Sequence, residues 1–456
     1  MRLPNIVFIL CDDLGINDLC CYGRTDHHTP HLDALAAAGT RYTSAYASQA
    51  ICSASRAGLL TGLNPARLHM TTFLPGRRDC DAQRVLHPEI AMQIPLSIKM
   101  WPRYFKEAGY VTGLIGKWHV GDAPGPAAHG FDYVYHPADR LSTTPSDAEG
   151  GKAEYDLTRR TCAFIEAHRD QPFVAYLSHF TPHIPYAARD VLVKKNANAF
   201  EPVYAAVVET LDDTVGLILA KLDALGLTDD TIIVFTSDNG GLHVPEGPHE
   251  RVTHNTPFRA GKGFTYEGGQ RVPVIVRWPG RVPAGRVVDT PFNNVDWIPT
   301  LLEMAGQVTP PDLDGMSLAT GMCGGAFPVR PVCWHFPHYT NQGGRPSGAI
   351  RDGNWLLIER YDEDAIELYD LAADPGEQDE LSTRVPDQAR RLWKQLDAWR
   401  QAHAVQYNQP NPQCDESAFR SLYVDIDPST FDPVTATKSD WARMQQWRMA
   451  MDRAVE

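Results

Sequence analysis

Short apolar runs alternate with helical stretches through the first three quarters of the 456-residue chain. Runs of strand length stand at 6–10, 111–115 and 172–177, and helical patterns stand at 31–38, 56–60 and 102–108. A longer helix is expected over 201–225, followed by a strand at 231–235. Such alternation predicts βαβ units, and therefore an α/β fold with a large mostly parallel or mixed sheet flanked by helices.

A different organisation is expected toward the C-terminus. Glycine and proline cluster at 321–331, which predicts a domain boundary there. Short β-like pieces and one helix then indicate a smaller antiparallel sheet packed with a helix. We expect a main α/β domain at 1–330, a small C-terminal α+β subdomain at 331–404, and a C-terminal extension at 405–456 that packs on the body or on a partner subunit.

The charge balance restricts the partners of the chain. Forty-two Lys and Arg against 56 Asp and Glu give a formal net charge of -14, which argues against nucleic acid or an anionic membrane as the main partner. An anionic ligand would therefore need a local basic pocket. The apolar runs fall far below the roughly 20 residues of a membrane span. No signal peptide is seen at the start of the sequence, so we expect a cytoplasmic protein, or a periplasmic or secreted one if a leader was trimmed.

Oxygen-bearing side chains follow two of the expected strands. Asp12 and Asp13 come directly after the first apolar run, and Asp238 and Asn239 follow the run that begins at residue 231. Open α/β folds place ligands at the carboxyl ends of their strands. Ordinary strand-terminating turns are the alternative for each pair taken alone. Together, hard oxygen donors at two strand ends predict a site for Ca²⁺ or Mg²⁺.

Several cations and nucleophiles are expected near the same edge. Each has a plain alternative: Cys52 as a buried structural cysteine, and the lysines as solvated side chains. Cys52 begins a loop that turns into a helix with Arg56 in its first turn, and a helix N-terminus with a nearby guanidinium favours a thiolate or a bound anion. The remaining candidates lie in turns after strands or between glycines, and they are Lys117, His119, His183 and Lys262. A dication, several cations and two histidines are what transfer of a tetrahedral oxyanion requires.

From residue 4 to about residue 381 the chain resembles the type I sulfatase family, within the alkaline phosphatase superfamily. The run Cys52-Ser53-Ala54-Ser55-Arg56 is similar to the family signature Cys-x-Pro/Ala-x-Arg, with alanine where proline is commoner. Further segments resemble family motifs in family order, at 5–15, 116–119, 236–241 and 261–273. The resemblance implies that residues 1–330 form a catalytic sulfatase-like domain.

The resemblance also implies a mechanism. Cys52 would be oxidised to formylglycine by a formylglycine-generating enzyme, and its hydrate would attack the sulfur of a sulfate ester after losing a proton to Asp238. Ca²⁺, with Mg²⁺ as the other choice, would be held by Asp12, Asp13, Asp238, Asn239 and the residue-52 oxygen. Arg56, Lys117 and Lys262 would bind the sulfate oxygens. His183, together with Lys262, would protonate the leaving alcohol, and His119 would take the proton from the second hydroxyl.

A looser resemblance to galactose and N-acetylgalactosamine sulfatases, in the C-terminal part, implies a sulfated sugar as substrate, or an aryl sulfate in the test tube. His335, His338 and Arg351 are the candidate specificity residues, with packing of the small sheet on the large one as the alternative. Residues 72–79, with Arg77 and Arg78, are a second candidate for the mouth of the site, with a solvated loop as the favoured alternative. The competing functions are a phosphodiester or phosphonate monoester hydrolase, an unmatured anion-binding protein, and a Cys-His thiol hydrolase. A homo-oligomer is compatible with the sequence.

Overall fold

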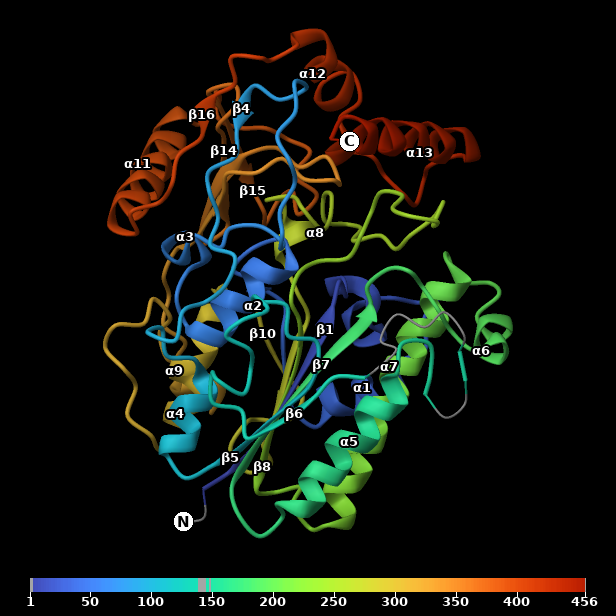
Figure 1. The fold of residues 1–456 in the computed structure, drawn as a ribbon, viewed down its shortest axis with the longest axis vertical. Helices are drawn as coiled ribbons and strands as arrows, with labels where there is room; N and C mark the ends of the chain where they lie inside the picture. Colours follow the sequence, from blue (N-terminus) through green and yellow to red (C-terminus); the bar gives the residue numbers. More distant parts are fainter. Residues whose placement is uncertain (1–2, 138–144, 147–148, 456) are drawn as a thin grey trace.

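An eight-stranded sheet crosses the centre of the protein (Figure 1). The structure is a computed structural model that describes residues 3–137, 145–146 and 149–455. Strands β8, β1, β7, β5 and β6 run parallel, while β9 is antiparallel to both β8 and β2. In sheet order the strands are β10 (Arg286–Val288), β2 (Thr40–Tyr42), β9 (Val274–Arg277), β8 (Thr231–Ser237), β1 (Asn5–Asp12), β7 (Phe173–Pro182), β5 (Val111–Gly116) and β6 (Tyr133–Tyr135).

Helices cover both faces of this sheet, as Figure 1 shows. Alternate residues of β1 enter opposite cores: Phe8 packs in one, and Val7 packs in the other. The Phe8 core contains α2 (Cys52–Thr61), α4 (Trp101–Glu107) and α9 (Trp297–Met304). The Val7 core contains α1 (Pro30–Ala37), α5 (Glu154–Ala167) and α7 (Pro202–Ala224). Burial on both faces explains why the central strands read as continuous apolar runs, and it confirms the predicted α/β class.

Short elements connect these layers. Two small sheets are formed by β3 (Ala45–Tyr46) with β11 (Phe292–Asn293) and by β4 (Val85–Leu86) with β16 (Gln409–Pro410). The short helices are α3 (Pro65–Leu68), α6 (Asp190–Lys195), α8 (Glu267–Gln270) and α10 (Ala319–Met322), with 3₁₀ turns η1 (Ile16–Asp18), η2 (Cys20–Tyr22), η3 (Asn294–Asp296) and η4 (Pro428–Thr430).

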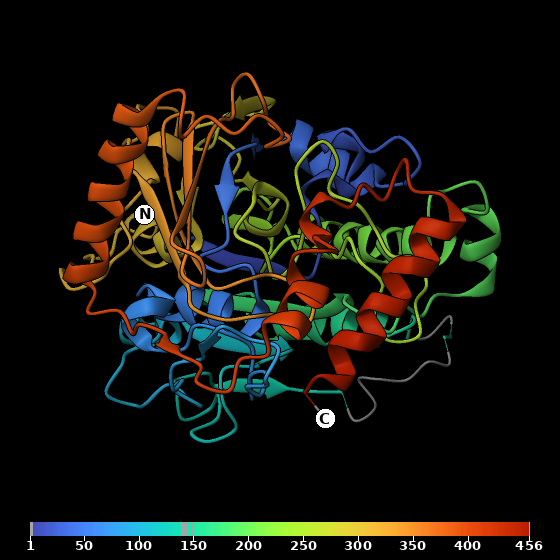
Figure 2. The ribbon, with the colours of Figure 1, turned by 90° about the horizontal axis from the view of Figure 1, so that it is seen from above.

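A second, antiparallel sheet lies in the C-terminal part, as predicted. Its strands are β12 (Val332–Phe336), β13 (Ser347–Asp352), β14 (Trp355–Arg360) and β15 (Ala365–Asp370), paired in that order. Helix α11 (Pro386–Ala402) covers one face through Leu392 and Leu396. The other face, with Trp334 and Leu356, packs against Tyr46 and other residues of the main domain. The small sheet therefore sits between its own helix and the large domain (Figure 2).

The last segment of the chain contains α12 (Glu416–Tyr423) and α13 (Lys438–Arg453), which Figure 2 shows well apart from α11. Phe419, Trp447 and Met451 pack against Tyr339 and Val244 of the preceding domains. These contacts favour packing on the body among the two alternatives that the sequence left open. No helix in the described part of the chain has the length and apolarity needed to cross a membrane.

Candidate active site

Strand register brings the predicted carboxylates together. Asp12 is the partner of Pro182 on β7, and Cys11 is the partner of Ser237 on β8. His183 follows Pro182, and Asp238 follows Ser237. Asp13, which follows Asp12, is therefore expected to lie between His183 and Asp238 at this edge of the sheet. Asp13 and His119 both adopt left-handed backbone conformations, with φ of 67° and 63°. Non-glycine residues in this region cost conformational energy, and they gather at functional sites.

Each buried aspartate of the site is paired with a cation. Burial opposes ionisation of Asp12, but Lys117 and His183 hold its pKa well below the usual range. Burial raises the pKa of Asp238 to about 7, although Arg56 opposes this rise. The ion pairs join Lys117 Nζ to Asp12 Oδ2 at 2.5 Å, Lys262 Nζ to Asp13 Oδ2 at 2.7 Å, and Arg56 Nε to Asp238 Oδ2 at 2.7 Å.

Cys52 is the first residue of α2 and is only 3% exposed. The helix begins four residues earlier than expected, so Arg56 lies in its second turn rather than its first. Burial raises the pKa of the Cys52 thiol, while Lys117 and Lys262 act in the opposite direction. The helix N-terminus and the two ammonium groups together make this position favourable for an anion.

Two oxygen atoms of the site are buried without a hydrogen-bond partner among the described residues: Asp12 Oδ1 and Asn239 Oδ1. Asn239 donates through Nδ2 to Asp13 Oδ1 at 2.8 Å, so its amide nitrogen is satisfied while its carbonyl oxygen is not. Asp12, Asp13 and His183 each offer a ligand atom within 4.8 Å of the others. Unsatisfied buried oxygens are costly, and a hard dication satisfies them. The residues present therefore fit the predicted metal.

The two predicted histidines differ in their surroundings. Burial and the neighbouring Lys117 lower the pKa of His119 to about 2, and its buried Nδ1 has no hydrogen-bond partner in the described structure. His183 Nδ1 lies 2.6 Å from Ile184 O, and its Nε2 lies 3.7 Å from Asp13 Oδ2. Burial and Lys262 lower the pKa of His183. Both rings line the cavity described below, where a proton can be exchanged with a bound group.

A cavity of about 650 Å³ opens over these groups. Asp12, Lys117, His119 and His183 form part of its polar lining. Its apolar lining includes Leu74, Pro75, Met92, Trp118 and Phe180. Leu74 and Pro75 belong to the 72–79 segment, so their position favours the alternative in which this segment lines the mouth over the solvated loop. A cavity with both polar and apolar walls suits a ligand with an anionic group on a larger carbon frame.

Three predicted substrate residues lie elsewhere, buried within the small sheet and its contacts. His335 contacts Tyr361 Oη at 2.8 Å and Gln406 O at 2.7 Å. His338 Nε2 lies 2.7 Å from Thr71 Oγ1. Arg351 NH1 lies 3.6 Å from Glu267 Oε2. These contacts favour the packing alternative, and the role of the three residues in specificity stays a prediction.

Sequence reasoning missed two polar residues of the site. Ser178, on β7, accepts a hydrogen bond from Arg56 NH1 at 2.6 Å and so fixes the guanidinium. Lys152 lines the cavity although it is only 3% exposed. Burial lowers the pKa of Lys152 to about 8. A lysine next to glycine is the pattern that identified Lys262 as a candidate. Gly150 and Gly151, directly before Lys152, form a similar pattern.

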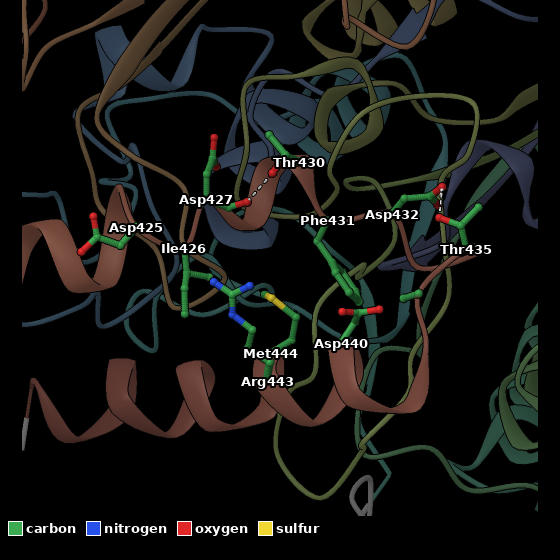
Figure 3. Close-up of a pocket in the computed structure, with 11 residues that line it drawn as sticks. Asp425, Ile426, Asp427, Thr430, Phe431, Asp432, Thr435, Asp440, Arg443 and Met444 are labelled. Carbon is green, nitrogen blue, oxygen red and sulfur yellow. Dashed lines mark hydrogen bonds between the residues drawn. The ribbon is translucent and has the colours of Figure 1, made fainter.

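A separate pocket of about 390 Å³ lies in the C-terminal extension (Figure 3). Aspartates surround it, but their carboxylates accept hydrogen bonds from residues of the same turns. Asp427 Oδ1 accepts from Ser429 N at 2.9 Å, and Asp432 Oδ2 accepts from the Thr435 hydroxyl at 2.7 Å. Asp440 is likewise bound by Thr437. The acidic rim is therefore explained by local capping.

Comparison with known proteins agrees with the geometry. Residues 4–307 match the family described as "Sulfatase", and residues 260–402 match "N-sulphoglucosamine sulphohydrolase, C-terminal". An N-acetylgalactosamine-6-O-sulfatase of Bacteroides thetaiotaomicron is 29% identical over 87% of this chain and 93% of its own. The N-acetylgalactosamine-6-sulfatase of Canis lupus familiaris is 34% identical over 73% of this chain and 68% of its own.

The solved structure of Ps i-CgsB in complex with k-i-k-neocarrahexaose is also similar, with a TM-score of 0.75 and 25% identity. The alignment covers 99% of both chains. The first family match alone spans two thirds of the sequence, and it includes every strand end that contributes to the site. The chain therefore belongs to the sulfatase family, within the alkaline phosphatase superfamily, and is a sulfuric ester hydrolase.

Proposed function

We propose that the protein removes sulfate from a saccharide containing galactose or N-acetylgalactosamine, with a formylglycine made from Cys52 and a bound Ca²⁺. One observation carries the proposal: Cys52 lies at a helix N-terminus, where Lys117, Lys262, Asp12 and Asp238 all act on it electrostatically, and oxygen atoms of Asp12 and Asn239 in the same site lack partners. This arrangement combines a position for a nucleophile, a site for a dication, and cations for a sulfate group.

The residues of the site take separate roles in this proposal. Asp12, Asp13, Asp238, Asn239 and the residue-52 oxygen would hold the metal, which supplies Lewis acidity toward oxygen ligands. Their charges and donors are already held in place in the described structure, so little reorganisation is needed when substrate binds.

The surrounding cations and histidines act on the ester. Lys117 and Lys262 bind the sulfate oxygens. Arg56 holds the Asp238 carboxylate and adds a third positive charge that stabilises the sulfate. Asp238 accepts a proton from the nucleophilic hydroxyl. His119, neutral at working pH, accepts the second proton, and His183 donates to the oxygen of the leaving alcohol, which is otherwise a poor leaving group.

The substrate class is supported by the relatives and by the cavity. Two similar proteins are named as N-acetylgalactosamine 6-sulfatases, and a similar structure contains a neocarrahexaose. The apolar wall of the cavity can pack on the carbon face of a sugar ring, while its polar part receives the sulfate. We therefore place the scissile sulfate on a galactose-type ring.

The test begins with protein produced together with a formylglycine-generating enzyme. Peptide mass spectrometry should show the loss of mass that marks an aldehyde at position 52. The product should release sulfate from an aryl sulfate and from N-acetylgalactosamine 6-sulfate, much faster than it cleaves the matched aryl phosphate or phosphonate. Faster cleavage of the phosphorus esters would favour a phosphonate or phosphodiester hydrolase. An unmodified thiol with full activity would overturn the proposed chemistry.

Two further measurements complete the test. Cys52→Ser should abolish turnover, because a simple alcohol retains the sulfate as a stable ester. A chelator should abolish activity and lower the Tm, and Ca²⁺ should restore both. Asn239→Ala should weaken the effect of Ca²⁺ on the Tm, whereas Asn198→Ala, at an exposed position, should leave it unchanged. Equal Ca²⁺ responses in all three proteins would remove the metal site from the proposal.

A further inference from the structure

Lys152 is a buried cation that the proposed reaction does not use. It stands just before α5, after two glycines, and its side chain forms part of the lining of the 650 Å³ cavity together with Lys117 and His183. The sulfate group already has three cations, in Arg56, Lys117 and Lys262. Lys152, which lines the cavity together with Lys117, therefore needs a different partner.

The contacts of Lys152 include no direct ion pair among the described residues. Its ammonium donates to His183 O, which is a neutral carbonyl. The neighbouring carboxylate, Glu154, is bound instead by the Lys152 backbone amide at 2.7 Å and by the Thr181 hydroxyl at 2.6 Å. Among the described residues, no carboxylate oxygen lies within ion-pair distance of Lys152 Nζ. An ammonium has three donors, so donors remain for a bound ligand.

The attachment to the His183 loop indicates which part of a substrate Lys152 would face. His183 is the group that protonates the leaving oxygen in the proposed function, so it faces the alcohol rather than the sulfate. Lys152 is tied to the carbonyl of that same residue. A buried ammonium without a direct ion pair is costly, and an anion on the alcohol part of the ligand would lower that cost.

We propose that Lys152 is a specificity-determining residue that binds a second anionic group on the saccharide that carries the scissile sulfate. The group is a carboxylate or another sulfate, since both offer the oxygen acceptors that an ammonium requires. This inference rests on the proposed function, because it takes the sulfate ester to be bound at Cys52.

Three saccharides test the inference: N-acetylgalactosamine 6-sulfate, its 4,6-disulfate, and a disaccharide in which a hexuronate is linked to N-acetylgalactosamine 6-sulfate. We expect the matured enzyme to show a kcat/KM at least 10-fold higher for one of the two doubly charged substrates. Lys152→Met should remove most of this preference, chiefly through KM, and Lys152→Arg should restore part of it. A preference for the disulfate would identify the second anionic group as a sulfate, and a preference for the hexuronate disaccharide would identify it as a carboxylate.

The control is Lys195→Met, which removes an exposed lysine paired with Glu209 and should leave the preference unchanged. If Lys152 only positions the His183 loop, Lys152→Met will lower kcat/KM equally for all three saccharides, and the inference is overturned. It is also overturned if the wild-type enzyme shows no preference.

Binding to the Cys52→Ala protein, measured by calorimetry, separates this inference from the proposed function. Failure to release sulfate from any ester would reject the proposed reaction, whereas the ratio of affinities tests Lys152 without turnover. Tighter binding of a doubly charged saccharide that depends on Lys152 supports the inference. Equal affinities, or no binding of any of the three, overturn it.

Discussion

Arg56 shows how a single side chain organises the site. It is fully buried, donates through Nε to Asp238 at 2.7 Å, and donates through NH1 to Ser178 at 2.6 Å. From helix α2 it therefore connects Asp238, just after β8, with Ser178 of β7. A lysine has the same charge but lacks the planar fork of donors, so it cannot make both bonds in fixed directions.

We expect Arg56→Lys to lower kcat/KM for an aryl sulfate by about 100-fold or more, the range seen when one donor to a developing charge is lost. The measurement is steady-state kinetics on protein with confirmed formylglycine, alongside a melting curve. Arg391→Lys is the matched control, because Arg391 is an exposed residue that pairs with Asp352 at the surface. Nearly normal kinetics in Arg56→Lys would show that the fork is not required.

At the scale of elements, the end of β5 depends on a close approach of two backbones. Gly116 pairs with Ser178 of β7, and its φ is 109°. A Cβ at this position would lie 1.9 Å from Ser178 O, which is far inside van der Waals contact. The next residue is Lys117, so any shift of this turn moves an ammonium that the site requires.

We expect Gly116→Ala to destabilise the protein and to lower kcat/KM by at least about 10-fold, since small displacements of positioned groups have such effects. Gly109→Ala is the control: its φ is also positive, at 87°, but nothing lies within 4 Å of its Cβ. That variant should show only the cost of about 1–2 kcal/mol for a left-handed alanine. Urea unfolding and aryl sulfate kinetics of both variants make the comparison. Equal losses in the two would mean that the crowding at Gly116 relaxes easily.

The sequence was sufficient for the order of elements because the core strands are apolar on both faces and are separated by recognisable helices. It also pointed to Asp12 and Asp238, since parallel strands end at one edge of a sheet. It could not reveal Lys152, whose burial depends on contacts with the distant His183. It also left open the role of Arg351, because only the tertiary structure places Glu267 beside it.

At the scale of the whole molecule, the two sheets meet around a pair of buried carboxyl groups. Glu267, on the large domain, donates its backbone N–H to both carboxylate oxygens of Glu377, which follows the small sheet. Tyr46 and Arg271 bind the Glu267 carboxylate, and Arg351 approaches it to 3.6 Å. Burial raises the pKa of Glu267 to about 7, and burial together with Glu267 raises the pKa of Glu377 well above its usual value.

These shifts predict how stability depends on pH. Both carboxyl groups hold protons more tightly in the folded protein than in the unfolded chain, so their protonation contributes stability that is fully present below about pH 4.5. That contribution is lost as the pH rises through about 7. Glutamine at position 377 resembles the protonated group and keeps an acceptor for the Glu267 amide. We therefore expect Glu377→Gln to raise the Tm at pH 8 relative to the wild type, with the difference shrinking toward pH 5.

Melting curves from pH 5 to pH 8, at fixed ionic strength and Ca²⁺ concentration, measure this effect. Glu303→Gln is the control, because Glu303 is exposed and its change should shift the Tm equally at every pH. If the difference in Tm between Glu377→Gln and the wild type is the same at every pH, ionisation of the two carboxyl groups does not destabilise the folded protein, and the prediction fails. A rising difference would mean that the junction of the two sheets weakens as its carboxyl groups ionise. Because Tyr46 and Arg271 of the main domain hold that junction, its loosening would then reach the large domain as well as the small sheet.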